Sequence, residues 1–88
     1  MSGEAVIPEN PPFDKDWTFR DFRIAGLAMS IRELAEHTVA YKTLRRIELA
    51  KAEPRMKTIR KLSNDLNLTI PEVGILVENS QKEHGDDN

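Results

Sequence analysis

The sequence predicts an all-α domain, and three observations support this prediction. Apolar residues recur every three or four positions through the body of the chain, as they do on one face of an amphipathic helix. Two segments have the Ser/Thr-x-x-Glu pattern that caps the start of a helix. The chain has 88 residues, of which 39% are hydrophobic, enough for one small core. We therefore expect one compact domain of five helices.

The first helix is expected where aromatic residues recur at helical spacing. Asp14 or Asp16 can cap its start, because a carboxylate accepts hydrogen bonds from the free N–H groups of the first turn. Gly26 should end or loosen this helix, since glycine has a low helix propensity. The aromatic residues are Trp17, Phe19 and Phe22. At this spacing they are more typical of a core than of a surface that stacks on nucleic acid.

Two short helices follow, separated by a turn of three or four residues. Ser30 and Glu33 have the spacing of a capping box, in which each side chain binds a backbone N–H at the helix start. The next helix begins around Ala40, and Leu44 and Ile47 lie three apart on its apolar side. Alanine supplies no side-chain cap at this position, a loss of about 1 kcal/mol.

Two further helices complete the domain. Pro54 interrupts the chain, and the apolar residues after it are spaced three, three and four apart: Met56, Ile59, Leu62 and Leu66. Asn67 is expected to end this fourth helix. The segment Thr69-Ile70-Pro71-Glu72 begins the last helix as a second capping box, with proline in the tolerated first turn. The buried side of that helix is expected to consist of Val73, Leu76 and Val77.

Both ends of the chain lie outside this helical pattern. Residues 1–13 contain three prolines and little apolar periodicity, so we expect a flexible arm. Residues 79–88 contain no apolar residue, which predicts a flexible acidic tail. The helical domain is therefore placed at residues 14–78.

The charge of the chain is distributed unevenly along its length. The formal net charge is −2 at pH 7, which by itself argues against nucleic-acid binding. Residues 42–61, however, contain eight lysines and arginines against two glutamates, a net charge of +6. Screening limits each charged patch to a range of about 10 Å, so this local charge matters more than the total. The segment is either a nucleic-acid-binding surface or an ordinary solvated helix face.

The composition disfavours several classes of function. The chain has no cysteine and only two histidines, far apart, so neither a disulfide nor a tight metal site is expected. It contains no nucleophile elbow, phosphate-binding glycine loop or zinc-protease motif, and we expect neither an enzyme nor a cofactor. No run of about 18 apolar residues and no signal-peptide pattern occur, which predicts a cytoplasmic protein without membrane contact.

Three stretches of the chain resemble the xenobiotic-response-element family of helix-turn-helix proteins, which contains the phage repressors and Cro proteins. They are residues 29–36 (MSIRELAE), 41–48 (YKTLRRIE) and 54–62 (PRMKTIRKL), in an order and spacing close to those of the family. The resemblance covers roughly residues 19–77. It implies a lambda-repressor-like domain that places its third helix in the major groove of DNA.

The resemblance also implies roles for particular side chains. In the family, the first, second and sixth residues of the third helix face base edges, and the residues at these positions are Tyr41, Lys42 and Arg46. Contacts with the sugar-phosphate backbone are implied for six others: Arg32, Thr43, Arg45, Lys51, Arg55 and Lys57. The plainer alternative is that these residues are simply exposed and confer solubility.

The turn before the third helix departs from the family pattern. Residues 37–40 lack the usual glycine and are one residue short. A shift of one residue rotates a helix face by about 100°, which would move Arg45 into the groove in place of Arg46. Ala50 stands where the family usually has glycine. Glu48, an acidic residue among basic ones, is expected to tie the helix to a nearby arginine rather than to meet DNA.

We expect a sequence-specific transcriptional regulator that binds a palindromic operator in double-stranded DNA as a homodimer. Its dimer surface is predicted to come from Ile75, Leu76 and Val77, because three consecutive apolar residues cannot all face one core. The expected setting is bacterial or phage-encoded and nucleoid-associated, with the protein repressing or dually regulating a phage, mobile-element or autoregulated operon. The alternative is a protein-interaction module on the same fold, an antitoxin that binds a toxin or an anti-activator that binds an activator.

Overall fold

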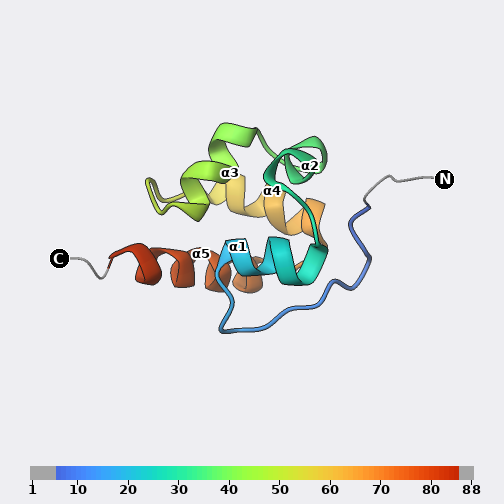
Figure 1. The fold of residues 1–88 in the computed structure, drawn as a ribbon, viewed down its shortest axis with the longest axis horizontal. Helices are drawn as coiled ribbons and strands as arrows, with labels where there is room; N and C mark the ends of the chain where they lie inside the picture. The colour runs from blue at the N-terminus through green and yellow to red at the C-terminus, as the bar shows by residue number, and fades with distance from the viewer. Residues whose placement is uncertain (1–5, 86–88) are drawn as a thin grey trace.

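In the computed structural model of this protein, residues 6–85 are described, and all their regular secondary structure is helical. The elements are α1 (Phe19–Asp21), the π-helical segment η1 (Phe22–Leu27), α2 (Ile31–His37), α3 (Tyr41–Glu48), α4 (Met56–Leu66) and α5 (Ile70–Gly85). Because η1 continues α1 without a break, the described residues contain five helical bodies, as the sequence predicts. Figure 1 shows α2 and α3 in the upper part of the molecule and α5 running along its lower part.

The first helix begins later than the sequence predicts. Thr18 caps it, since the Thr18 hydroxyl accepts from the Asp21 N–H at 3.1 Å and the Asp21 carboxylate accepts from the Thr18 N–H at 3.0 Å. Asp14 instead closes a turn, in which its carboxylate accepts from the Asp16 N–H at 2.8 Å. The prediction of a start at Asp14 or Asp16 is wrong, because a complete capping box at Thr18 satisfies two backbone groups of this segment at once.

Gly26 does not end the first helix, which continues as a π-helix to Leu27 and ends at Ala28 in the left-handed conformation. A Cβ atom at Gly26 would lie 3.2 Å from Trp17 Cζ3 and 3.2 Å from Phe22 Cδ1. Glycine therefore allows the close approach of two aromatic rings here and does not act as a helix breaker.

The caps predicted for α2, α4 and α5 are confirmed, and so is the missing side-chain cap at the start of α3. Ser30 and Glu33 form the capping box of α2. Asn67 ends α4 in the left-handed conformation, with φ 58°. The Thr69 hydroxyl and the Glu72 carboxylate bind each other's backbone N–H groups at 3.2 and 2.9 Å. The start of α3 at Ala40 has no side-chain cap.

The last helix extends well beyond the boundary predicted at residue 78. It continues to Gly85 because two polar side chains in the predicted tail bind the start of the fold. Asn79 Nδ2 donates to the carbonyl oxygens of Lys15 and Trp17, both at 2.8 Å. Ser80 is 1% exposed. The prediction of a flexible tail is therefore wrong for residues 79–85, while residues 86–88 lie outside the described part.

The described part of the N-terminal arm is docked on the helices. Residues 6–13 have no regular secondary structure, but Ile7 and Phe13 pack against the core. Asn67 Nδ2 donates to the Pro8 carbonyl at 2.8 Å, which ties the arm to the end of α4. Residues 1–5, the rest of the predicted arm, lie outside the described residues.

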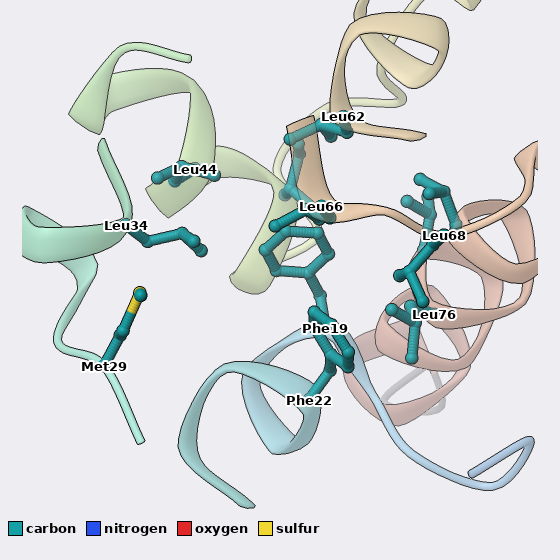
Figure 2. Packing of buried hydrophobic residues seen from close by; sticks show 12 residues of the cluster. Phe19, Phe22, Met29, Leu34, Leu44, Leu62, Leu66, Leu68 and Leu76 are labelled. Carbon is teal, nitrogen blue, oxygen red and sulfur yellow. The ribbon is translucent and has the colours of Figure 1, made fainter. Parts of the chain in front are cut away.

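Twelve buried apolar side chains from all five helical bodies and the segments next to them form the core. Figure 2 shows Phe19 and Phe22 between the leucines of α2 and α3 on one side and Leu68 and Leu76 on the other. The two apolar methionines of the helical domain are expected to fill the core. Met29 is buried, but Met56 is 49% exposed, so this expectation is wrong for Met56, the first residue of α4.

Candidate nucleic-acid interface

Helix α3 has one buried face and one exposed basic face. Leu44, Ile47 and Glu48 are buried, whereas the side chains of Lys42, Arg45 and Arg46 are exposed. At about 100° per residue, Lys42 and Arg46 lie closest to the direction opposite the buried face. Arg45 lies to one side, nearer to α1. The shorter turn before α3 therefore leaves Arg46 in the more outward position of the two neighbouring arginines.

A buried ion pair fixes this orientation of α3. Arg23 Nε donates to Glu48 Oε2 at 2.6 Å, and Arg23 Nη2 donates to Glu48 Oε1 at 3.1 Å. Arg23 Nη1 donates to the Met29 carbonyl at 2.9 Å, which adds the segment between η1 and α2. The two ion-pair side chains are 10% and 5% exposed. The predicted structural role of Glu48 is confirmed, and such a two-point pair resists rotation of α3 about its axis.

Tyr41, at the start of α3, lies close to two guanidinium groups. Arg32 Cζ is 5.6 Å and Arg45 Cζ is 6.0 Å from the centroid of the Tyr41 ring. Both distances are within the range of a cation–π interaction. Arg32 belongs to α2, so the ring connects the first turn of α2 with α3. The ring thus lies close to two of the residues expected at the phosphates, and the predicted contact of Tyr41 with bases stays a prediction.

Further basic residues lie on the other side of α3. The chain leaves α3 through Ala50, whose φ of 54° is in the left-handed region, and the Lys51 N–H donates to the Arg46 carbonyl at 2.9 Å. A cavity of about 450 Å³ separates α3 from the loop and the first turns of α4. Arg46 and Arg55 both line this cavity, so residues nine apart in sequence reach one surface.

Of the remaining predicted contacts, Thr43 lines the same cavity and is half-buried, while Lys51 and Lys57 are exposed and do not line it. Sequence reasoning did not single out Leu49, which is 40% exposed directly after α3. Its spacing could have identified it, because it follows Lys42 and Arg46 at helical intervals and so lies on the same outward face. An apolar side chain at this position can contact the methyl group of thymine.

The predicted dimer surface is only partly exposed. Leu76 is fully buried and Val77 is 8% exposed, because both side chains pack in the core of this same chain. The assignment of these two residues to a dimer surface is therefore wrong. Ile75 is half-buried, and the exposed apolar residue on the same helix is Ile70, at 39%. Neighbouring helix positions are about 100° apart, so two consecutive side chains, Leu76 and Val77, can reach the same core while the third, Ile75, cannot.

Within residues 6–85, no cluster of three or more histidine, aspartate or glutamate side chains has the arrangement of a metal site. Across the same range, every helix is too short or too polar to cross a membrane.

A helix-turn-helix family model matches residues 19–73 of the chain, a span that includes α1 to α4 and the first turn of α5. In the same comparisons, no curated protein and no solved structure matches the chain.

Proposed function

Because this chain belongs to the helix-turn-helix family of DNA-binding regulators, the group of the Cro and phage-repressor proteins, we propose that it is a sequence-specific transcriptional regulator. The observation that carries the proposal is the outward face of α3. Lys42 and Arg46 are exposed there, on a helix whose orientation is fixed from behind by the buried Arg23–Glu48 pair. A single α-helix fits the major groove of B-DNA, where lysine and arginine pair with the acceptors of guanine.

The surrounding basic residues hold the phosphate backbone in this proposal. Arg32 and Arg45 both lie close to the ring of Tyr41, on the flank of α3 that carries Tyr41. Lys51, Arg55 and Lys57 lie on the opposite flank, in the loop and at the start of α4. Phosphates on both edges of the groove thus meet positive charge, which sets the register of the protein on DNA without reading sequence. Tyr41 orients the two arginines next to it, and Thr43 adds a hydroxyl contact.

The regulator binds a palindromic operator as a homodimer in this proposal. A single α3 reads few base pairs, and a second copy related by two-fold symmetry doubles the number. The residues that support dimerisation are two isoleucines of α5: Ile70, which is 39% exposed, and Ile75, which is half-buried. Gly74 lies between them, and a Cβ atom there would meet nothing within 4 Å, so another helix has room to approach closely.

The proposal is tested by separating base recognition from phosphate binding. DNA that binds the protein is selected from a random pool, and each variant is measured on that DNA and on an unrelated duplex. Lys42→Ala and Arg46→Ala should each cost about 1–3 kcal/mol on the selected DNA and little on the unrelated duplex. Arg55→Ala and Lys57→Ala should weaken binding to both duplexes to a similar extent.

Lys82→Ala on α5 is the matched control, because this exposed lysine is not among the residues assigned to DNA and should leave both affinities unchanged. Arg45→Ala is compared with Arg46→Ala to decide which arginine enters the groove. If none of the α3 variants changes sequence preference while the fold is intact, α3 does not read bases. The protein is then better explained as an interaction module that binds another protein, such as a toxin or an activator.

A further inference from the structure

A second cavity, of about 400 Å³, lies on the α1 side of helix α3. Arg20 of α1, Arg45 and Leu49 at the end of α3, Ile31 of α2 and His84 of α5 are among the residues that line it, and we name it the α1–α3–α5 cavity. Its volume is within the range of about 300–1,000 Å³ that is common for small-molecule sites. It lies across α3 from the cavity of Arg46 and Arg55, so the helix expected to enter DNA separates the two.

The α5 wall of this cavity belongs to the part of the helix that the sequence pattern did not predict. His84 and Glu83 follow the segment that Asn79 and Ser80 attach to the start of the first helix. They also lie beyond residue 73, where the match to the helix-turn-helix family ends. The cavity is therefore completed by residues outside the matched span, and a docked helix holds these residues in place.

Two arginines of the cavity are available to a ligand. Arg23 and Glu48 also line it, but their charges neutralise each other and the Arg23 donors are already engaged. Arg20 and Arg45 are exposed, and among residues 6–85 neither has an acidic partner within ion-pair distance. The one other carboxylate in the lining, that of Glu83, is 3.9 Å from His84 Nε2.

Apart from His84, the remaining lining is apolar. Ile31 is half-buried and Leu49 is 40% exposed, so each presents hydrocarbon surface to the cavity beside the two guanidinium groups. A guanidinium group matches the planar fork of a carboxylate with paired N–H donors. Hydrocarbon next to it favours a ligand whose oxyanion is attached to an apolar body.

We propose that the α1–α3–α5 cavity binds a small carboxylate with an apolar body, whose oxyanion is held by Arg20 and Arg45. Ile31 and Leu49 contact the apolar part. Arg45 is also one of the residues assigned to the DNA backbone, so a bound carboxylate competes with a phosphate for the same guanidinium. Ligand and DNA therefore weaken each other's binding by the same factor, an effect that rests on the proposed function.

Direct binding is tested first, on the full chain and without DNA. Sodium benzoate, sodium acetate and inorganic phosphate are titrated at constant ionic strength while the backbone amide resonances are followed by NMR. Benzoate should shift the amides of Leu49, Ile31 and His84 with a dissociation constant on the order of 1 mM, as suits so small a ligand. Acetate and phosphate should bind at least about tenfold more weakly, because they lack the apolar body.

Arg20→Gln should weaken benzoate binding about tenfold, since the variant loses one charged donor of the site. Arg60→Gln, which removes an exposed arginine from α4, is the control and should leave benzoate binding unchanged. The assignment is overturned if benzoate shifts none of these amides, if phosphate binds as tightly as benzoate, or if Arg20→Gln binds benzoate as the wild-type chain does.

Competition with DNA is tested on duplexes that the chain binds. Benzoate at a few times its wild-type dissociation constant should weaken DNA binding severalfold in the wild-type chain and much less in Arg20→Gln, because the variant binds benzoate about tenfold more weakly while Arg20 is not among the residues assigned to DNA. A wild-type DNA affinity that does not respond to saturating benzoate overturns the competition. If the chain binds benzoate at this site but binds no DNA, the proposed function fails and the cavity assignment stands.

Discussion

At the scale of single residues, the buried Arg23–Glu48 pair contributes to the orientation of a helix more than to the stability of the fold. Both side chains are almost completely covered, and removing two ions from water costs several kcal/mol that their attraction only partly returns. Their three hydrogen bonds join η1, the segment before α2, and α3. The pair therefore contributes a defined orientation of the DNA-facing helix, which an apolar contact of the same size would leave free to adjust.

Glu48→Ala should lower the free energy of unfolding by about 3–5 kcal/mol, because it leaves the Arg23 charge buried without a partner. The measurement is urea unfolding followed by the fluorescence of Trp17, whose ring lies 6.4 Å from that of Phe22. The double variant Arg23→Met/Glu48→Leu should recover part of this loss, since no unpaired charge remains. A loss below about 1 kcal/mol in Glu48→Ala would contradict the structural role of the pair.

Ala50 has a φ of 54°, a conformation that costs a residue with a Cβ atom about 1–2 kcal/mol. Ala50→Gly removes this strain but gives the unfolded chain more freedom, so the net gain in stability should be at most about 1 kcal/mol. Ala28→Gly, at φ 55°, should behave in the same way. Ala52→Gly is the control, because Ala52 is not among the positive-φ residues, and it should be neutral or slightly destabilising. Equal effects at positions 50 and 52 would show that the left-handed conformation is not strained.

At the scale of elements, helix α5 stabilises the beginning of the fold. The first N–H groups of any helix lack partners within it, and the Phe19 N–H in α1 finds its acceptor in Ser80 Oγ at 2.9 Å. The same hydroxyl donates to the Leu76 carbonyl at 2.9 Å. A serine 61 positions further along the chain thus takes part in capping the first helix. This explains why a polar segment without apolar residues is nevertheless helical.

Ser80→Ala should destabilise the protein by about 1–3 kcal/mol, because it leaves the buried Phe19 N–H without an acceptor. The unfolding midpoint in urea gives the loss, and hydrogen exchange of the Phe19 amide should become faster than that of amides in α4. Glu78→Ala, an exposed change two residues earlier, is the control and should stay within about 0.5 kcal/mol of the wild type. An unchanged Phe19 exchange rate in Ser80→Ala would refute the tertiary cap.

At the scale of the whole molecule, the arrangement of charge matters more than its sum. The net charge of −2 combines a basic segment of residues 42–61 with acidic segments before and after it. The fold places the exposed part of the basic segment along α3, the following loop and the start of α4. Field strength at one surface, not total charge, steers a polyanion to it.

DNA affinity should therefore depend steeply on salt although the protein is acidic overall. Each neutralised phosphate contributes about 0.9 to the slope of log affinity against log salt, so five charged backbone contacts predict a slope of about −4 to −5. A mobility-shift titration between low and moderate salt measures it. Arg55→Ala should reduce the slope by about one unit, whereas Lys82→Ala should not change it. An affinity indifferent to salt would rule out this mode of binding.

Sedimentation at micromolar concentration should give twice the chain mass of 10.0 kDa, as a homodimer through Ile70 and Ile75 of α5 requires. Ile75→Lys should shift this equilibrium toward the monomer, because it places a charge in the proposed apolar contact. Ile24→Lys is the control, since Ile24 is 45% exposed but lies on η1, away from α5. Circular dichroism of each variant shows that its helices persist. A wild-type monomer at high concentration would disprove this dimer.

The sequence by itself determined the features of the helices that depend only on neighbouring residues. Capping boxes at Ser30 and Thr69, the stop at Asn67 and the apolar spacing within α4 are local, and local hydrogen bonds and periodicity decide them. The basic surface of α3 was also readable, since the charges on one face of a helix follow from residue spacing alone.

Only the tertiary structure decided the features that depend on partners distant in the chain. The helix at residues 79–85 exists because Asn79 and Ser80 bind backbone groups about 60 residues away, which no local pattern reveals. Leu76 and Val77 face the core because α5 packs between α1 and α4 at one particular rotation. Which of Arg45 and Arg46 faces outward likewise depends on the rotation of α3, which the Arg23–Glu48 pair fixes. Periodicity tells which residues share a face, but the direction of that face is fixed by packing against elements that are distant in sequence.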